Sequence, residues 1–426
     1  MSEAGGCGRN RIYSPAVVLW LLIFQRLGGG ASLETAVLGL LRGLPASFWP
    51  TPCKRIRDWQ EQGKMPSSHS GAYNQARQAL PLAVVQQSCD RIFEELIARM
   101  GSDSSASQEH VFLLDGSTVR TSHSPSLCKS YPPGGNQHGE GHWPLVRVLV
   151  AHDLQTGLGM RPEWGAMHGP DAVSEQSLVE QAIGRLPQGA TVLADANFGV
   201  FSVAYTGQQN GHPVLLRLTP DRAKYLAAES LRDGIDRPLV WKPSRWDRKA
   251  HPGLPADACV TGRLIVQRVA PSHGAAPFLL ALFTDLPTST EAVVALYGRR
   301  WNIETDLRTL KSTLSLDQLT CTTPDMVAKE IDMALAAYNL VRAVTWLASQ
   351  QSGIPPRGYR FTKILLLVNA FGPEIATAAT PQESQRKFEQ LMRCVQQSKL
   401  YPRKRKRPSY PRAVWNKGAR YPNHKT

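Results

Sequence analysis

The sequence has few of the features that mark disulfide-stabilised, secreted or membrane-spanning proteins. Its seven cysteines are scattered and never form a C-x-x-C pair, which argues against a disulfide framework or a zinc ribbon and for a reducing compartment. The apolar run Ala16 to Phe24 is much shorter than the roughly 20 residues of a membrane-spanning helix. Because Ser14-Pro15 is a good helix start and Gln25-Arg26 ends the run, we expect a packed helix of a cytoplasmic protein rather than a signal peptide.

Acidic residues are outnumbered by basic ones. The chain has 34 Asp and Glu against 49 Lys and Arg, a formal net charge of +15. Such an excess favours a polyanionic partner, nucleic acid first and an anionic membrane surface second. With 426 residues, 42% of them hydrophobic and 19% charged, the chain is long and apolar enough for a substantial core in two or three lobes.

Two patterns that could indicate other enzyme classes are weak. His138 and His142 have the i, i+4 spacing of a zinc site, but the Gly-rich stretch around them offers no shared helix face. Ser117 and His123 follow Asp115, yet the sequence has no G-x-S-x-G elbow, which argues against a hydrolase triad. Neither pattern predicts a function.

The chain divides into five consecutive parts. Residues 1–105 form helical segments, and a DNA-binding lobe and a solvated helical bundle both remain open. Residues 110–220 run strand-strand-strand-helix-strand-helix-strand, which predicts a mixed sheet covered by helices. Residues 221–288 predict a β-rich insertion, residues 289–350 complete the core with helices, and residues 351–426 add helices and a basic, Pro-rich tail.

Two aspartates each end a short apolar run. Val111 to Asp115 and Thr191 to Asp195 predict buried strands that lead to an acid. Adjacent strand ends can bring the two carboxylates within a few ångströms, which is costly unless a divalent cation neutralises them. Oxygen ligands suit Mg²⁺ or Mn²⁺, and two such ions about 3.5–4 Å apart can drive displacement at phosphorus. Taken singly, an Asp-Gly turn and a helix cap explain the two acids equally well.

A third acid lies in a stretch rich in cations. Residues 297–311 have no Pro and one Gly near the start, which predicts a single helix. At roughly 100° per residue, one arc of about 80° contains five polar side chains. They are Tyr297, Arg300, Glu304, Arg308 and Lys311. This arc is typical of a helix that contributes a metal ligand and binds a polyanion. Considered alone, Glu304 is more simply interpreted as a salt-bridge partner of Arg300 or Arg308.

Two further sets of side chains complete that helix. A stripe beside the arc is expected to pack against the protein, and a polar set lies opposite. The stripe consists of Leu296, Ile303, Leu307, Leu310 and Leu314, and the opposite set consists of Asn302, Asp306, Thr309 and Thr313.

The spacing Y-x2-R-x3-E-x6-K, with both aspartates upstream, resembles the DDE transposases of bacterial insertion sequences, specifically the IS-four family with its Y-R-E-K signature. The resemblance covers about residues 110–350, including the stretch Ala337 to Arg342. It implies an α/β, ribonuclease-H-like core with a mixed sheet flanked by helices, interrupted by a β-rich insertion before the Glu304 helix. The helical N-terminal lobe would then have a role in binding DNA ends.

The same resemblance implies a mechanism. Asp115, Asp195 and Glu304 would be the catalytic, metal-binding triad for Mg²⁺, with Mn²⁺ as a substitute. Activated water would cut the ends of the insertion sequence, and the freed 3′-hydroxyl would attack the opposite strand or the target DNA. The partners would be the terminal inverted repeats, the target DNA and a second copy of the chain in a synaptic complex on the bacterial nucleoid.

The resemblance also implies DNA-binding residues. Tyr297, Arg300 and Lys311 map onto signature positions that contact DNA near the cleavage point, and Arg308 shares their arc. Trp241 and Trp246 are candidates for stacking on a flipped base, although a tryptophan in the core of a small β lobe is the favoured alternative.

Two other functions remain open. A catalytically silent, transposase-derived DNA-binding protein would bind without cutting, and a ribonuclease-H-like nuclease would cut without joining. The basic tail, with Arg403 to Arg407 at its head, favours nonspecific phosphate contact in any of these readings.

Overall fold

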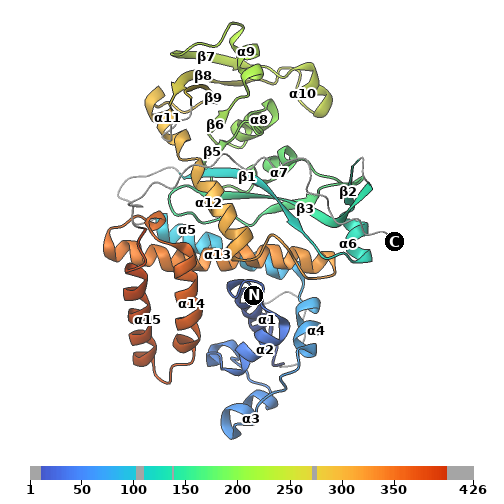
Figure 1. The fold of residues 1–426 in the computed structure, drawn as a ribbon, viewed down its shortest axis with the longest axis vertical. Coiled ribbons are helices and arrows are strands. Elements are labelled where there is room, and N and C mark those ends of the chain that lie inside the picture. Colours follow the sequence, from blue (N-terminus) through green and yellow to red (C-terminus); the bar gives the residue numbers. More distant parts are fainter. Residues whose placement is uncertain (1–10, 102–109, 137–138, 271–275, 401–426) are drawn as a thin grey trace.

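The computed structural model describes residues 11–101, 110–136, 139–270 and 276–400, and Figure 1 shows their arrangement. A mixed sheet runs through the upper and middle parts of the molecule in this view, and the first helices gather beneath the long helix α13 (Pro324–Ser352). No helix among these residues is long and apolar enough to cross a membrane. The basic tail lies outside the described residues.

The N-terminal part is helical. Ser14 caps the first helix, and its hydroxyl accepts a hydrogen bond from the backbone N–H of Val17 at 3.3 Å, so the expected helix start is confirmed. The helices are α1 (Pro15–Leu27), α2 (Leu33–Leu41), α3 (Lys54–Gln62), α4 (Gly71–Ala79) and α5 (Leu82–Gly101), with the short 3₁₀ helix η1 (Ala46–Phe48). Both α1 and α5 pack against α13.

Five strands form the core of the sheet. They are β1 (Val111–Arg120), β3 (Gly139–Asp153), β4 (Glu163–Ala166), β5 (Thr191–Ala194) and β6 (Val214–Arg217). β3 pairs antiparallel with β1 and β4, whereas β5 is parallel to β1 and β6 is parallel to β5. The order β4-β3-β1-β5-β6 with these directions is the ribonuclease-H-like arrangement. The predicted fold class is therefore confirmed.

The region between β6 and the Glu304 helix adds strands to the same sheet. β9 (Phe278–Thr284) pairs antiparallel with β6, and β8 (Val260–Val269) and β7 (Ile235–Trp241) follow, which gives a nine-stranded sheet with β2 (Pro133–Asn136) at the other end. The helices α9 (Pro220–Ala227) and α10 (Arg245–Ala250) accompany these strands. The predicted β-rich stretch thus extends the core sheet.

The single helix predicted for residues 297–311 is wrong. α11 (Thr290–Gly298) ends before Arg299, α12 (Trp301–Arg308) begins after Arg300, and a π-helical turn η2 (Thr309–Thr313) follows. A tight turn links the first two, in which Arg300 N donates to Tyr297 O at 2.9 Å. Gly298, the last residue of α11, is a weak helix former, which favours the break.

The remaining helices pack against the sheet or against α13. They are α6 (Pro125–Ser130), α7 (Glu175–Ile183), α8 (Phe201–Gln209), η3 (Pro356–Gly358), α14 (Phe361–Ala376) and α15 (Pro381–Gln396). Thr323 caps α13 and Pro324 is its first residue, as predicted.

Alternate residues of β1 belong to two buried clusters, one on each face of the sheet. Leu113 packs in the cluster that includes α1, α12 and α13, while Phe112 and Leu114 pack in the cluster of α7 and α8. The predicted packing stripe of the Glu304 region is largely confirmed, since Ile303, Leu307, Leu310 and Leu314 are buried. Leu296 is half-buried.

Candidate active site

Asp115 and Asp195 lie at matching positions on neighbouring parallel strands. The register of β1 and β5 pairs Leu114 with Ala194, and each aspartate is the next residue. β1 continues beyond Asp115 to Arg120, paired with β3, so only the pairing with β5 ends there. Asp115 Oδ1 accepts from Gly116 N at 2.9 Å, and Asp195 Oδ1 accepts from Asn197 N at 2.9 Å. The fold therefore brings the two acids together, both half-buried.

The surroundings disfavour two negative charges at this place. Burial, together with the charge of Asp195 and a smaller effect of Glu175, raises the pKa of Asp115 to about 6, against the lowering effects of the Gly116 N–H and Arg300. A divalent cation would relieve this excess of negative charge, and carboxylate oxygens are the donors that Mg²⁺ and Mn²⁺ prefer. The two aspartates therefore fit a metal of this class.

The third predicted ligand cannot be compared with the pair. Glu304 belongs to α12, but its side chain lies outside what the structure describes. Among the described side chains, no three His, Cys, Asp or Glu residues form a group that could hold a metal ion. α12 packs on β1 and β3, so the helix that carries Glu304 is next to the strand that carries Asp115.

Tyr297 and Arg300 lie close to the aspartates. Tyr297 is only 6% exposed, and burial raises its pKa while the positive charges of Arg300 and Arg217 lower it and the charge of Asp195 raises it. Arg300 is half-buried, and its charge acts on both Asp115 and Tyr297. Tyr297, Arg300 and the aspartates thus affect one another's pKa values near the ends of β5 and β6.

Arg217 was missed by the sequence analysis. It is the last residue of β6, the strand beside β5, and its guanidinium lies 5.6 Å from the ring centre of Phe278. The same signal that marks Asp195, a polar residue directly after a buried apolar run, would have found it. Arg217 adds a cation at the strand ends that also carry the acids.

Lys311 and Arg308 lie further along the broken helix. Arg308 is exposed at the end of α12, and Lys311 is half-buried in η2. At about 1.5 Å per residue, Lys311 is roughly 17 Å from Arg300 along the helical direction. An arc on one straight helix therefore does not describe how Arg300, Arg308, Lys311 and Tyr297 are arranged.

Asp306 was predicted on the side of the helix away from the packing stripe, which is wrong. It is completely buried, and its carboxylate accepts from Arg342 at 2.6 Å, from Arg357 at 2.9 Å and from the Tyr338 hydroxyl at 3.1 Å. Burial would raise the pKa of Asp306, but Arg342, His152 and Arg357 lower it. The cluster fixes α12 to α13 and η3 two residues after Glu304.

The two tryptophans differ in their access to DNA. Trp241 is 3% exposed, with its ring 5.2 Å from Phe283 and 6.1 Å from Phe201, so its candidacy for base stacking is wrong in this fold and the core alternative holds. Trp246 is 74% exposed on α10, and the Lys249 ammonium lies 5.8 Å from its ring centre. Trp246 stays a prediction.

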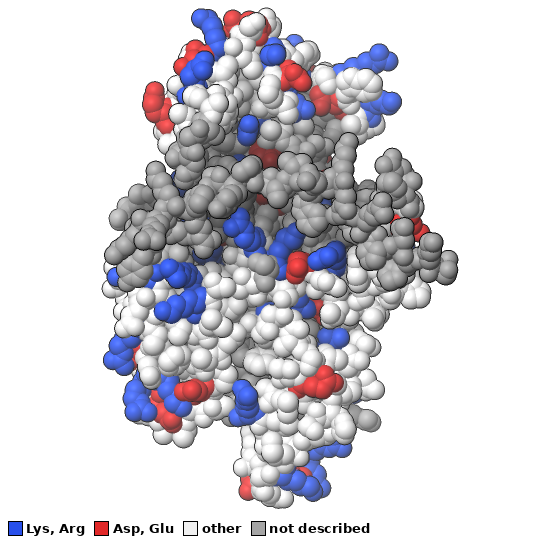
Figure 2. Space-filling view, in the orientation of Figure 1, with Lys and Arg blue, Asp and Glu red and all other residues white. Residues whose placement is uncertain are grey.

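On the face drawn in Figure 2, Lys and Arg side chains lie near the middle, at the level where Figure 1 draws α12 and the lower strands, and others lie over the top of the molecule and along its lower left edge, with Asp and Glu among them. His138 lies outside the described residues, and His142 instead packs its ring 4.5 Å from that of His123. Nothing in that pairing suggests a zinc site.

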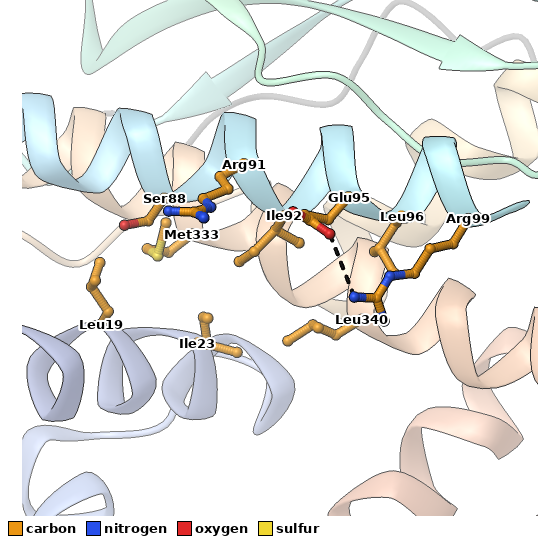
Figure 3. A pocket seen from close by; sticks show the side chains of 10 residues that line it. All are labelled: Leu19, Ile23, Ser88, Arg91, Ile92, Glu95, Leu96, Arg99, Met333 and Leu340. Carbon is orange, nitrogen blue, oxygen red and sulfur yellow. Dashed lines mark hydrogen bonds and ion pairs between the residues drawn. The ribbon is translucent and has the colours of Figure 1, made fainter. Parts of the chain in front are cut away.

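A separate hollow lies away from the aspartates. It has a volume of about 540 Å³ between α1, α5 and α13, with Ile23, Ile92 and Leu340 among its apolar walls and an ion pair between Glu95 and Arg99 at one side (Figure 3). It shares no lining residue with the site at the strand ends.

Three comparisons relate the chain to known proteins. The family model described as "Transposase DDE domain" matches residues 106–340. The transposase InsG for insertion sequence element IS4 of Escherichia coli (strain K12) is 27% identical over 317 residues, which cover 72% of this chain and 68% of that protein. The chain also resembles a piggyBac transposase in a synaptic complex with hairpin DNA. The match covers 92% of this chain and 78% of the other, at 9% identity and a TM-score of 0.39, and this similarity is too low to support any conclusion about this chain.

Proposed function

Because this chain belongs to the transposase DDE domain family and is a metal-dependent DNA transposase, we propose that it cuts the ends of its insertion sequence and joins the 3′-hydroxyl ends to target DNA. Asp115, Asp195 and Glu304 are the catalytic acids in this proposal. The metal is Mg²⁺, with Mn²⁺ as a substitute. The protein works in the bacterial cytoplasm on nucleoid DNA.

The observation that carries the proposal is the pair of aspartates at the strand ends. Asp115 and Asp195 follow the last paired residues of two parallel strands, and burial and mutual repulsion raise the pKa of Asp115 to about 6. Two divalent cations would supply activation of the attacking oxygen and stabilisation of the leaving oxygen. The protein's part is to hold the two acids together at the strand ends, where their carboxylate oxygens can bind the cations.

Glu304 is proposed as the third acid on the position of its helix. α12 packs on β1 and β3, and the buried Asp306 ties the same helix to Arg342 and Arg357. A helix fixed in this way can hold the Glu304 carboxylate at a constant position relative to Asp115 and Asp195.

The DNA contacts are proposed to follow the cations. The Arg300 charge acts on Asp115 and Tyr297, and Arg217 ends the strand beside Asp195, so these two cations would bind the phosphates beside the scissile bond. Arg308 and Lys311 would bind phosphates further along the duplex. Trp246, exposed on α10, is the remaining candidate for stacking on a flipped base. Two DNA ends must be brought together, and one catalytic site per chain supports a homodimer.

The direct test uses purified full-length protein, duplexes carrying the terminal inverted repeats, and Mg²⁺ or Mn²⁺. We expect end cleavage followed by joined products, and no cleavage with Asp195→Ala, Asp115→Asn or Glu304→Gln. Glu389→Gln, a change of an exposed acid on α15, is the matched control and should cut like the wild type. Unchanged cleavage by Asp195→Ala would contradict the assignment.

Two other outcomes would support the alternatives. Binding of the repeats without cleavage under Mn²⁺ would indicate a silent DNA-binding protein. Cleavage without joined products would indicate a nuclease.

A further inference from the structure

A fourth acid lies against the strand that carries Asp115. Glu175 is the first residue of α7, and the place where a Cβ would stand on Gly116 is 2.7 Å from the Cδ and Oε1 atoms of Glu175. Any side chain at residue 116 would therefore displace the Glu175 carboxylate. The absence of a side chain at Gly116 allows this carboxylate to approach the backbone next to Asp115.

Asn197 connects this carboxylate to the second aspartate. Its side-chain amide donates to Glu175 Oε2, and its backbone N–H donates to Asp195 Oδ1 at 2.9 Å. The Gln176 side chain donates to the Asn197 carbonyl at 3.1 Å, so the start of α7 holds this residue at two points. The loop after β5 is thereby hydrogen-bonded to the start of α7 by the residue that also orients Asp195.

The placement of Glu175 is not explained by the needs of the helix alone. Ser174 already caps α7, since its hydroxyl accepts from Ser177 N at 3.0 Å. An acid in the first turn stabilises a helix through its dipole wherever its side chain points. Arg147 Nη1 forms an ion pair with Glu175 Oε1 at 3.7 Å, and the side-chain amide of Asn197 donates a hydrogen bond to the other oxygen, Oε2, which orients the carboxylate.

We propose that Glu175 is a positioning residue of the active site, which holds Asn197 and, through it, orients the Asp195 carboxylate for metal binding. The inference rests on the proposed function, because it concerns the same metal site. Partners that orient a ligand in this way typically change metal affinity by about 10–100-fold when they are removed. Glu175 acts here through its hydrogen bond to Asn197.

The test measures Mn²⁺ binding to the full-length protein by isothermal titration calorimetry, without DNA and independently of cleavage. Glu175→Ala and Asn197→Ala should each weaken Mn²⁺ binding by about tenfold or more. The double variant should be no weaker than either single one, because both changes break the same connection. Glu175→Gln should bind Mn²⁺ almost as the wild type does, since its amide oxygen can accept the same hydrogen bond.

Matched controls separate this role from a structural one. Gln181→Ala, on the exposed side of α7, should leave Mn²⁺ binding unchanged. Thermal unfolding of each variant checks folding, and if Glu175→Ala does not fold, the comparison of Asn197→Ala with Glu175→Gln still decides. Binding of Mn²⁺ by Glu175→Ala or Asn197→Ala as in the wild type would overturn the proposal. Additive losses in the double variant would also overturn it, as would a Glu175→Gln variant as weak as Glu175→Ala.

Two more variants separate a failure of this inference from a failure of the proposed function. Asp115→Asn and Asp195→Asn should each strongly weaken Mn²⁺ binding. If they do while Glu175→Ala does not, only the role of Glu175 is wrong. If neither weakens binding, the metal site itself is wrong and the inference falls with it.

Discussion

Arg342 donates a hydrogen bond of 2.6 Å to Asp306, and both side chains are almost completely buried. Arg357 pairs with the opposite oxygen of the same carboxylate at 2.9 Å. Asp306 follows Glu304 by two residues in α12, so an ion cluster in the core controls the position of the helix on which the third acid lies.

Removing Asp306 should be strongly destabilising. Asp306→Ala leaves Arg342 buried without its counter-charge, and breaking a buried pair in this way costs about 3–5 kcal/mol. Urea unfolding followed by circular dichroism measures the loss. Asp317→Ala is the matched control, because Asp317 and Arg120 form an exposed pair at 3.8 Å that should contribute at most about 1 kcal/mol. Equal losses in the two variants would contradict the role given to the cluster.

The burial of Asp306 could not be predicted from the sequence. A helical wheel assigns a polar residue to solvent unless it has a partner, and the partners of Asp306 are 36 and 51 residues away. The break at Gly298 has a related origin. Helix propensity favours continuation through Arg299 and Arg300, but α11 and α12 each pack in their own place, and tertiary packing overrides propensity.

The strand-end acids, by contrast, were within reach of the sequence. Apolar runs of β-branched and leucine residues predict buried strands, and the residue that follows such a run lies at the edge of the sheet. The order of strands and helices over residues 110–220 was enough to predict a mixed sheet. The pairing of β6 with β9 was not, because that contact joins segments separated by the strands of the insertion. Glu175 was missed because its neighbour Gly116 is distant in sequence.

Gly199 lies in the loop after β5, against the end of β6. A Cβ on Gly199 would be 1.9 Å from the Arg217 carbonyl oxygen, so Gly199→Ala must push the backbone after Asp195 away from β6. We expect a loss of roughly 2–3 kcal/mol or more in stability, as for other overpacked sites, together with reduced end cleavage. Chemical denaturation and the cleavage assay measure the two effects.

The control for this change is another glycine with room for a methyl group. A Cβ on Gly184 would have its nearest neighbour at 3.6 Å, and its φ of −63° suits any residue, so Gly184→Ala should leave stability and cleavage close to wild type. A Gly199→Ala protein as stable as Gly184→Ala would show that the strand ends can separate freely.

Asp332 should make the stability depend on pH. Burial, together with smaller effects of the Asp90 and Glu163 charges, raises its pKa from 3.8 to about 7, against the lowering effects of Arg161 and Arg185. The folded state therefore keeps a proton that the unfolded state releases, so this contribution is fully present below about pH 4 and is lost as the pH rises to about 7. At about 1.36 kcal/mol per unit, the loss is on the order of 4 kcal/mol.

The measurement compares unfolding free energies of the wild type and Asp332→Asn between pH 4 and pH 8. The variant has no titrating group at this position, so its stability should fall less steeply with pH over the window from 4 to 7, whatever its absolute stability. Parallel curves for the two proteins would show that Asp332 does not hold a proton in the folded state.

Metal binding at the proposed site should also depend on pH. Here a falling pH should reduce end cleavage, whereas for Asp332 a rising pH reduces stability. The pKa of Asp115 is raised to about 6, chiefly by burial and then by the charge of Asp195, and a proton competes with a cation for the same carboxylate. End cleavage should therefore need more Mg²⁺ as the pH falls below 6, by about tenfold per pH unit if one proton is displaced. Between pH 7 and pH 8 the requirement should be nearly constant.

The Mg²⁺ concentration for half-maximal cleavage, measured from pH 5 to pH 8, decides the point. DNA binding without metal must be measured in the same buffers, because a lower affinity for the duplex could also reduce cleavage at low pH. If DNA binding holds while the Mg²⁺ requirement rises only below pH 6, the proton and the metal share the Asp115 carboxylate. If the Mg²⁺ concentration for half-maximal cleavage is constant down to pH 5, the metal does not displace a proton from this buried acid. Asp115 would then not be a metal ligand.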